Sequence, residues 1–471
     1  MRNTCALAAV AGLAIASLAS AGVVDATIHL AEGDAVDGST IDNLNSPFTN
    51  GLGQIGLVAT LADGRRAIML NGVEIFTSDD ALPDVLTGGE GTMGVGDNGE
   101  FIYSPSFNGG DAVYGDVGII AEDDAPAIDF TPGFNNTFHS RPRMLPDGSS
   151  YWVSGTNDGA GGTSTQNRII YLRNAGSGNI FGILRAGDNV GGAIVAPAGG
   201  IDFDNAISDD GQQFLWIFND VLAGGTAADG TLAINNTVIA QEGGPTGQGD
   251  NWDNFDQTDI NNAGNYLVSG DTDGATTVDE FIAYNGTIVL RENDALGGGI
   301  VDGSVDAVSI NDDNEAAFIW ELDLGTGPAE TLFFASDAAD IPGTAQAVVS
   351  VGDVLDVDGD GMGDLTVTDF NAGIGPGVNL AEDGFVHVEL DVEDNDLLQF
   401  EIIATFAVGG VSPCNAADNA EPFGVLDLGD VGGFVAGFLG QTPAADLAAP
   451  FGVWDLADVQ AFIAAFTGGC P

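Results

Sequence analysis

The chain has 471 residues, with 70 acidic residues against nine basic ones, all of them arginine, for a formal charge of −61. Nucleic acids and anionic membranes are recognised through basic patches, so this composition argues against both as partners. A hydrophobic content of 44% argues against disorder. We interpret most of the acidic residues as a solubility feature for salty surroundings, where screening limits self-repulsion to about 8 Å. Attraction of divalent cations is the alternative.

Residues 1–21 have the features of a secretion signal. Arg2 is the lone positive charge, residues 6–18 are apolar, and Ala19-Ser20-Ala21 is a cleavage site of the A-x-A type. The apolar run is too short for a membrane anchor, and no later segment is long and apolar enough to span a bilayer. The mature protein is therefore expected outside the cytoplasm, secreted or at the cell surface, with no membrane span.

Residues 22–410 contain seven copies of a two-part sequence motif. An apolar strand ends in an acidic turn, and after a link a second turn leads into another apolar or aromatic strand. The acidic turn falls at Asp34, Asp80, Asp124, Asp188, Gly243, Asp294 and Asp353. The second turn falls at Gly53, Gly99, Gly148, Gly211, Gly264, Asn314 and Gly384. Copies recur every 44 to 64 residues, a spacing typical of propellers and arrays.

Each copy has room for four short strands, which predicts an all-β fold: a seven-bladed β-propeller of four-stranded antiparallel blades. One strand precedes the second turn, as at 201–203 and 367–370, and one follows it. The other two form a hairpin, with Asn71-Gly72 and Asn285-Gly286 supplying the positive φ angles of a type I′ turn. A row of separate sandwiches is the alternative, but each would need roughly a hundred residues.

The two ends of this region predict ring closure. The first copy begins with only the last strand of a unit, at 28–32. The seventh copy has three strands, at 365–370, 385–392 and 397–406, and then stops. The N-terminal strand would complete the final blade and remove two sheet edges at once.

An acidic loop in the seventh copy has the spacing D-x-D-x-D-G-x-x-D of an EF-hand-type calcium loop. Its candidate ligands are Asp356, Asp358, Asp360, Met362 through its carbonyl, and Asp364. Position 12 of the loop is Val367 rather than Glu, and no EF-type helices are expected around it. The sequence predicts a bound Ca²⁺ between two strands, and an ion-free acidic hairpin is the alternative.

Residues 411–471 form a separate module with a twofold repeat offset by 28 residues. Val431, Phe434 and Phe438 lie on one predicted helical face, and the same face recurs at Val459, Phe462 and Phe466. Two loop–helix units would thus bury aromatic stripes against each other. Cys414 and Cys470 bracket the module and are the only cysteines after the signal, which in a secreted protein predicts a disulfide.

This module resembles a dockerin of the duplicated type ending in Gly-Cys, found in planctomycete secreted proteins. The resemblance covers about sixty residues: Pro-Phe-Gly-Val-x-Asp-Leu-x-Asp-Val twice, then Gly469-Cys470-Pro471. It implies calcium in both loops and tethering to a cohesin-type receptor. The metal candidates are Asp418, Asp427, Asp430, Asp446, Asp455 and Asp458.

The leading part of each dockerin-like loop departs from the pattern. Asp418 and Asp446 lie one residue too far upstream, and Pro-Phe occupies positions where a dockerin places oxygen ligands. Capping of the two helices by these aspartates is the alternative to calcium binding. Residues 22–410 more loosely resemble tandem N-x-x-G-x-x-x-F repeats of anchored bacterial surface proteins, which imply no established activity.

No catalytic constellation stands out. The arginines are too scattered for sialidase-type carboxylate binding, and His29, His139 and His387 have no metal-ligand spacing. No catalytic residues are predicted, and no cofactor except calcium. We expect a binding or surface-structural module with a possible glycan ligand. A polysaccharide-active enzyme, either a glycoside hydrolase or a lyase, is the alternative. Convergent carboxylates with shifted pKa values in an axial cleft would favour the enzyme, and an axis filled by small apolar residues would favour the binder.

Overall fold

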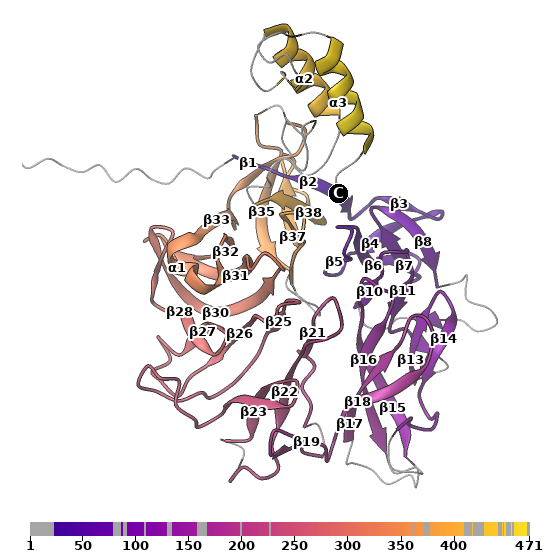
Figure 1. Cartoon of the computed structure of the whole chain (residues 1–471), viewed down its shortest axis with the longest axis vertical. Helices are drawn as coiled ribbons and strands as arrows, with labels where there is room; N and C mark the ends of the chain where they lie inside the picture. Colours follow the sequence, from indigo (N-terminus) through magenta and orange to yellow (C-terminus); the bar gives the residue numbers. More distant parts are fainter. Residues whose placement is uncertain are drawn as a thin grey trace, which may run out of the picture.

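The computed structural model describes residues 23–408 except 79–85, 88–91, 108–109, 130–133, 158–166, 198–199, 226–227, 360 and 372–376. In the C-terminal module it describes residues 417, 428–440, 445, 447–448, 454 and 456–468. The predicted signal at 1–21 and both Cys414 and Cys470 lie outside these residues. Within them, strands form seven sheets of four or more strands and one two-stranded sheet, arranged around a common centre (Figure 1).

The first three large sheets, called I to III, follow one another along the chain. Sheet I has the order β3-β4-β6-β7-β8, with β5 beside β6: β3 (Ala35–Val36), β4 (Ser39–Asn43), β5 (Phe48–Thr49), β6 (Ile55–Leu61), β7 (Arg66–Leu70) and β8 (Val73–Thr77). Sheet II has the order β10-β11-β13-β12-β9, with β14 beside β13: β9 (Leu86–Thr87), β10 (Met93–Val95), β11 (Phe101–Tyr103), β12 (Ser106–Phe107), β13 (Gly110–Gly115) and β14 (Gly118–Glu122). Sheet III is a four-stranded meander: β15 (Asn135–Met144), β16 (Ser150–Asn157), β17 (Asn167–Arg173) and β18 (Ile180–Arg185).

Sheets IV to VI repeat the meander. The small pair β19 (Asn189–Val190) and β20 (Ala193–Ile194) precedes sheet IV: β21 (Ala206–Ile207), β22 (Phe214–Asn219), β23 (Gly230–Ile234) and β24 (Thr237–Gln241). Sheet V consists of β25 (Thr258–Ile260), β26 (Tyr266–Asp271), β27 (Glu280–Tyr284) and β28 (Thr287–Arg291). Sheet VI consists of β29 (Ala295–Leu296), β30 (Gly299–Ile310), β31 (Ala316–Asp323), β32 (Pro328–Ala335) and β33 (Ala345–Ser350), with the short helices η1 (Ala338–Asp340) and α1 (Ile341–Thr344) before β33.

Sheet VII joins the two ends of the repeat region, as the sequence predicts. Its strands are β1 (Val23–Asp25), β2 (Thr27–Ala31), β34 (Val354–Asp356), β35 (Leu365–Phe370), β36 (Val378–Leu380), β37 (Phe385–Asp394) and β38 (Gln399–Ala407). The N-terminal strand β2 pairs antiparallel with β38, so that Thr27 lies opposite Thr405. The predicted closing strand is thus confirmed. The parallel pairing of β1 with β34 was not predicted from the sequence.

The two repeated turns have the expected backbone. All seven residues of the second-turn column have positive φ, between 65° at Asn314 and 83° at Gly148. In the acidic turn, the carboxylates of Asp34, Asp188, Asp294 and Asp353 each accept the backbone N–H of the residue three positions earlier. The predicted hairpin turns at Asn71-Gly72 and Asn285-Gly286 also have positive φ at both residues.

Two predictions about the repeat are wrong in detail. Asp124 and Gly243 have positive φ and donate their N–H to the next strand, as Gly33 does, so they lie one column before the acidic position. Asp80 lies outside the described residues. The innermost strand of sheet IV is β21 rather than 201–203, where Ile201 forms only an isolated bridge with Phe218. Periodicity finds such columns to within a residue or a few, because the links between them vary in length.

Side chains also fasten neighbouring sheets at one recurring position. Three glutamates occupy equivalent places, two residues before a register shift with the following strand: Glu280 in β27, Glu330 in β32 and Glu401 in β38. Each carboxylate accepts a backbone N–H from the next sheet: from Val305 in β30 at 3.0 Å, from Phe370 at the end of β35 at 3.2 Å, and from Leu44 just after β4 at 2.6 Å. Glu280 is buried and the other two are half-buried, and hydrogen bonds to such acceptors fix the spacing of successive sheets.

The C-terminal module contains α2 (Leu428–Gly440) and α3 (Leu456–Gly468), at the predicted positions. Phe434 and Phe462 stack with ring centroids 4.2 Å apart, and Phe438 and Phe466 flank them. The two aromatic stripes therefore pack against each other as expected. Neither of these helices, nor any other in the described part of the chain, has the length and apolarity needed to cross a membrane.

Candidate functional site

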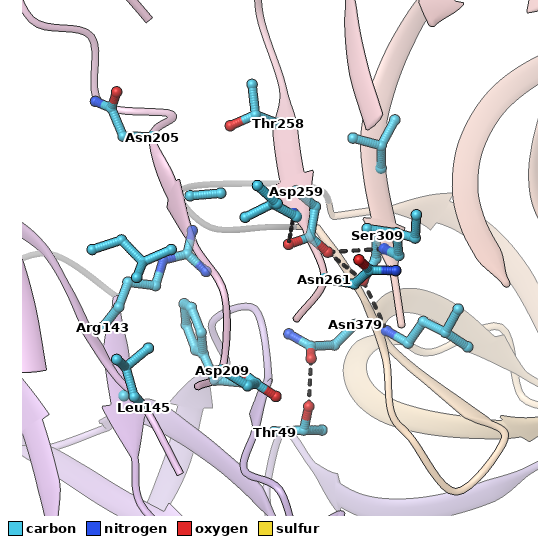
Figure 2. Close-up of a pocket in the computed structure, with 18 of the residues that line it drawn as sticks. Thr49, Arg143, Leu145, Asn205, Asp209, Thr258, Asp259, Asn261, Ser309 and Asn379 are labelled. Carbon is cyan, nitrogen blue, oxygen red and sulfur yellow. Dashed lines mark hydrogen bonds between the residues drawn. The ribbon is translucent and has the colours of Figure 1, made fainter. Parts of the chain in front are cut away.

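A cavity of about 140 Å³ lies where the innermost strands of the sheets meet. Its wall takes one residue or more from every large sheet: Thr49, Val95, Met144, Ile207, Ile260, Ile310 and Leu380. These residues come from β5, β10, β15, β21, β25, β30 and β36 in turn. The cavity thus occupies the axis of the ring, and Figure 2 shows the side chains around it.

Asp259 in β25 is the best-fixed polar group of the wall. Its carboxylate accepts hydrogen bonds from the Ser309 hydroxyl at 3.1 Å, from the Ile310 N–H at 2.9 Å and from the Ile260 N–H at 2.9 Å (Figure 2). Burial raises the pKa of Asp259, and these hydrogen bonds oppose the shift. The bonds from Ser309 and Ile310 hold sheet V against sheet VI.

Sheets VII and I meet at the opposite side of the cavity. Thr49 donates its hydroxyl to Oδ1 of Asn379 at 2.5 Å (Figure 2). The Asn379 amide donates to the Pro47 carbonyl at 3.3 Å. The Leu380 N–H donates to the Ser309 hydroxyl at 3.2 Å, which links sheet VII to sheet VI. The ring is thus closed by hydrogen bonds at the axis as well as by β2 at its rim.

The second-turn loops form the mouth of the cavity. A directional series of bonds runs around it: the Asp210 N–H donates to Asn262, the Asn262 N–H to Asp312, and the Asp312 N–H to Glu382, at 2.7 to 3.0 Å. Burial raises the pKa of Glu382 to about 7, and the charges of Asp312 and Asp209 add to the shift. The mouth is therefore strongly acidic.

Asp209 and Arg143 are the charged groups that face the cavity without such bonds. Although solvent reaches Asp209, the surrounding protein raises its pKa to about 6, with the charges of Asp259 and Asp312 adding to the effect. The Arg143 guanidinium lies over the Phe48 ring, 4.9 Å from its centroid, and points toward Asp259 (Figure 2). Cation and anion thus face the same small volume.

A second, wider hollow of about 670 Å³ adjoins the axis between sheets IV, V and VI, and Asp204 and Gln257 line both. It is acidic, with Asp256, Asp271 and Glu280 in its wall. Burial raises the pKa of Glu280 to about 9, helped by a hydrogen bond with Asp271. Asp204 forms an ion pair with Arg141.

The predicted calcium loop brings three of its residues together. Carboxylate oxygens of Asp356, Asp358 and Asp364 lie within 4.8 Å of one another, the one such group among the described residues. Asp356 is buried and accepts the N–H groups of Gly359 and Gly361, both at 2.7 Å. Asp360 lies outside the described residues, and the Met362 side chain is exposed.

The dockerin-like loops are described at only two of their six candidate ligands. Asp430 and Asp458 are both fully buried in the first turns of α2 and α3. Asp458 accepts the N–H of Ala448 at 2.8 Å, so it joins the preceding loop to the first turn of α3. Asp418, Asp427, Asp446 and Asp455 lie outside the described residues.

The sequence did not identify the axial residues. Arg143 was one of several scattered arginines, and Asp209 was one of seventy acids. The signal that would have found Asp209 is the second residue of the second turn, which is acidic or Asn in five of the seven copies: Asp97, Asp209, Asn262, Asp312 and Glu382. Arg143 has no such signal. His29 and His387, which have no metal-ligand spacing in sequence, lie on either side of Thr405 and both contact its hydroxyl.

No protein-family model and no curated protein match the chain. Among solved structures it is similar to the β-propeller domain of the Trilobed protease from Pyrococcus furiosus, with 9% identity, 79% of this chain and 97% of that chain covered, and a TM-score of 0.44. It is also similar to the WD40 β-propeller domain of Doa1 (9% identity, 80% and 96% covered, TM-score 0.34). The match to TolB from Acinetobacter baumannii has 17% identity and a TM-score of 0.30, covering 52% of this chain and 53% of that chain. The radial sheet topology is that of a β-propeller, the class to which the first two belong.

Proposed function

We propose that the chain is an extracytoplasmic binding module: a seven-bladed propeller that holds a small polar ligand in its axial cavity. The observation that carries this proposal is the cavity itself, which every large sheet helps to build and whose charged groups Arg143 and Asp209 face one volume. Polar groups make up most of the surface of this cavity, with a few apolar side chains such as Ile207 and Leu380 between them, and such a wall suits a small polar ligand. The blade count is supported by the seven large sheets of the described residues and by their closure through β2.

The C-terminal module would tether the propeller to a cohesin-like receptor or another cell-surface component. Support comes from the paired helices, whose stacked Phe434 and Phe462 give the duplicated unit one small core. The proposed disulfide between Cys414 and Cys470 and the proposed calcium in both loops belong to the same resemblance. Secretion is supported by the signal-like residues 1–21.

A bound Ca²⁺ in the loop at 356–364 is part of the proposal. Two oxygen ligands on one Ca²⁺, each at 2.3–2.6 Å, lie at most about 5 Å apart, and the three carboxylates satisfy that limit. Hard carboxylate oxygens are the donors that Ca²⁺ prefers. Because no Glu stands at position 12, we expect a dissociation constant of about 10⁻⁴ to 10⁻³ M.

A polysaccharide-active enzyme is the second candidate. The raised pKa values of Asp209 and Glu382 favour it, because a carboxyl that titrates near neutral pH suits general acid catalysis. The apolar share of the axial wall, including Ile207, Ile260 and Leu380, favours binding alone. The axis therefore has part of what an enzyme requires, carboxyl groups with raised pKa values, and part of what a binding module requires, apolar residues along the axis.

A glycan-array and small-molecule screen with product analysis tests both functions. If the chain is a binding module, a ligand should raise the melting temperature and occupy the axial cavity in a crystal structure. Product analysis should then recover that ligand chemically unchanged. The enzyme predicts products that disappear in Asp209→Asn or Glu382→Gln. A ligand found only on the outer surface of the ring, or no ligand at all, would contradict the proposed function.

A further inference from the structure

Most polar groups in the wall of the axial cavity are already used to join the sheets. Asn379 bonds to Thr49 and Pro47, and Asn261 donates to the Asn311 carbonyl while accepting from Asn265. Asn205 is used in the same way, since its amide donates to the Asp202 carbonyl and accepts from Ile217. Together with Asp259, these groups hold the wall and have little left for a ligand.

Three side chains keep their hydrogen-bonding capacity. Among the described residues, the structure gives no hydrogen-bond partner to the Arg143 guanidinium, the Asp209 carboxylate or the Gln257 amide, and all three line the cavity. They supply a donor-only group, an acceptor-only group and a group that does both. A hydroxyl group also donates and accepts, so several hydroxyls on one small molecule can satisfy all three.

The charges around the cavity favour an uncharged ligand over anions, zwitterions and cations. Burial raises the pKa values of Asp259 and Asp204, and the positive charge of Arg143 already opposes this rise in both. A ligand carboxylate beside Arg143 would therefore meet those two carboxylates, and it would pass Asp312 and Glu382 at the mouth. Anions and zwitterions are disfavoured for this reason. A lone cation lacks the acceptors that Arg143 requires.

Two further features of the cavity limit the class of ligand it can hold. The ring of Phe48 is covered on one face by Arg143, and Tyr151 is buried, so the wall residues that the structure describes offer no open aromatic face for a stacked base or aromatic ligand. A volume of about 140 Å³ holds one small molecule or the terminal unit of a chain.

We propose that the ligand of the axial cavity is an uncharged polyhydroxy compound, a single sugar residue or a polyol, held by Arg143, Asp209 and Gln257. This inference rests on the proposed function and specifies its ligand. Arg143 donates to ligand oxygens, Asp209 accepts from ligand hydroxyls, and Gln257 orients the molecule between them. Because Asp209 must be ionised to accept two hydroxyls, affinity should fall as the pH drops below about 6.

Calorimetric titration of the full mature chain tests the inference with four kinds of probe. The probes are neutral monosaccharides and polyols, glucuronate as an anion, serine as a zwitterion, and ethylenediamine as a cation. Arg143→Met and Asp209→Asn should each weaken binding of a neutral sugar about tenfold or more, because each removes charged hydrogen bonds. Arg185→Met and Asp313→Asn are the matched controls, since neither these residues nor Asp188, the partner of Arg185, line the cavity, and they should change affinity less than about twofold.

The melting temperature separates a binding role from a structural one. Asp209 is crowded by other carboxylates, so Asp209→Asn should keep or raise the melting temperature above pH 6 while it weakens binding. If Asp209→Asn instead lowers the melting temperature and leaves affinity unchanged, the residue is structural and the inference is wrong. Binding of glucuronate, serine or ethylenediamine in place of neutral sugars would overturn the inference and leave the proposed function standing. No binding by any probe class and an empty cavity in crystals would overturn both.

Discussion

The two sides of sheet VII differ in what holds them to their neighbours. The side facing sheet VI, called here the apolar seam, buries one large hydrophobic cluster that includes Val386, Val388, Leu390, Ile402 and Phe406. The side facing sheet I, called the closure seam, adds only Leu30 and Ile403 to the hydrophobic cluster of sheet I. Its other buried residues are polar: His387, Glu389 and Thr405.

The chemistry of the closure seam follows from strand alternation. His387 and Glu389 alternate along β37 with Val386, Val388 and Leu390, so one face of the strand is polar and the other apolar. Thr405 receives contacts from the His29 ring at 2.8 Å and the His387 ring at 2.6 Å, and Asn371 donates to Glu389 at 2.8 Å. Sequential sheets can thus be joined by apolar packing, whereas the contact between chain ends relies on specific hydrogen bonds. Such bonds form in only one strand register, and their strength depends on pH because histidine and glutamate side chains take part in them.

Removing the closing strand should have the largest effect. Deleting residues 23–32 removes β2, exposes the edge of β38 and leaves Leu30's place in the core empty. Lost backbone bonds and lost apolar burial together should lower the free energy of unfolding by roughly 5 kcal/mol or more. Differential scanning calorimetry measures the effect, with deletion of 23–25 as the control because it removes β1 and spares β2. An unchanged melting temperature for the longer deletion would show that β2 does not close the ring.

Adjacent residues of β38 compare the two seams directly. Phe406→Ala empties a buried site in the apolar seam and should cost about 4 kcal/mol. Thr405→Val keeps the shape of the threonine side chain and removes only the hydroxyl between the two histidines. It should lower the free energy of unfolding by about 1–3 kcal/mol. Urea unfolding at pH 7 gives both values. If Thr405→Val were the more damaging, packing would not be what distinguishes the apolar seam.

Glu389→Gln should stabilise the protein at neutral and alkaline pH. Burial raises the pKa of Glu389 to about 9, with Glu401 and Asp391 adding to the shift, so the folded state holds a proton that the unfolded state releases above about pH 4.5. Stability is therefore lost as pH rises from about 4.5 to 9, by about 1.4 kcal/mol per pH unit. The glutamine variant keeps an acceptor for Asn371 and should gain about 3 kcal/mol at pH 7. Equal denaturation midpoints for both proteins at pH 5, 7 and 9 would contradict the shift.

His387→Gln should have the opposite pH profile and a smaller effect. Burial lowers the pKa of His387 to about 3, and the charge of His29 adds to the shift. The neutral ring is stabilising above the unfolded pKa of about 6.5, and that contribution is lost as the pH falls toward 3. The variant should therefore resist acid better than the parent by about 2 kcal/mol at pH 5, after normalising both at pH 7.5. His139→Gln, at a buried site in sheet III where burial lowers the pKa to about 4, should gain a similar amount at pH 5 and is the reference for buried histidines. If His387→Gln gives no gain at pH 5 while His139→Gln does, the neutral His387 ring does not contribute to the acid sensitivity of the closure seam.

Calcium should give the smallest effect, at the edge of the apolar seam. Leu355 in β34 belongs to the apolar cluster, and the loop at 356–364 begins at the next residue. Calcium at ten times its dissociation constant should add about 1.4 kcal/mol to the free energy of unfolding. Asp358→Ala should remove that calcium-dependent increment, whereas Asp396→Ala, in the hairpin between β37 and β38, should not. A full increment in Asp358→Ala would show that the ion binds elsewhere, for example in the dockerin-like loops.

The sequence by itself determined the repeat, the closing strand and the helical module. These features depend on local chemistry: glycine or asparagine at a positive φ, alternation of apolar residues in strands, and a helical period at Phe434 and Phe462. The spacing of the calcium loop is equally local, and it brought Asp356, Asp358 and Asp364 together. Local rules constrain neighbours in the chain, so they can be read without knowing the fold.

Only the tertiary structure decided which polar residues face the axis and which face a seam. Arg143 and Asp209 are 66 residues apart, and His29 and His387 are 358 residues apart, so no spacing rule connects either pair. Each pair meets because the ring closes: the axis gathers the innermost strand of every sheet, and the rim joins β2 to β38. The difference between Arg141, paired with Asp204, and Arg143, open to the cavity, is likewise absent from their nearly identical local sequence. It arises from the carboxylates that sheets IV and V place beside each guanidinium.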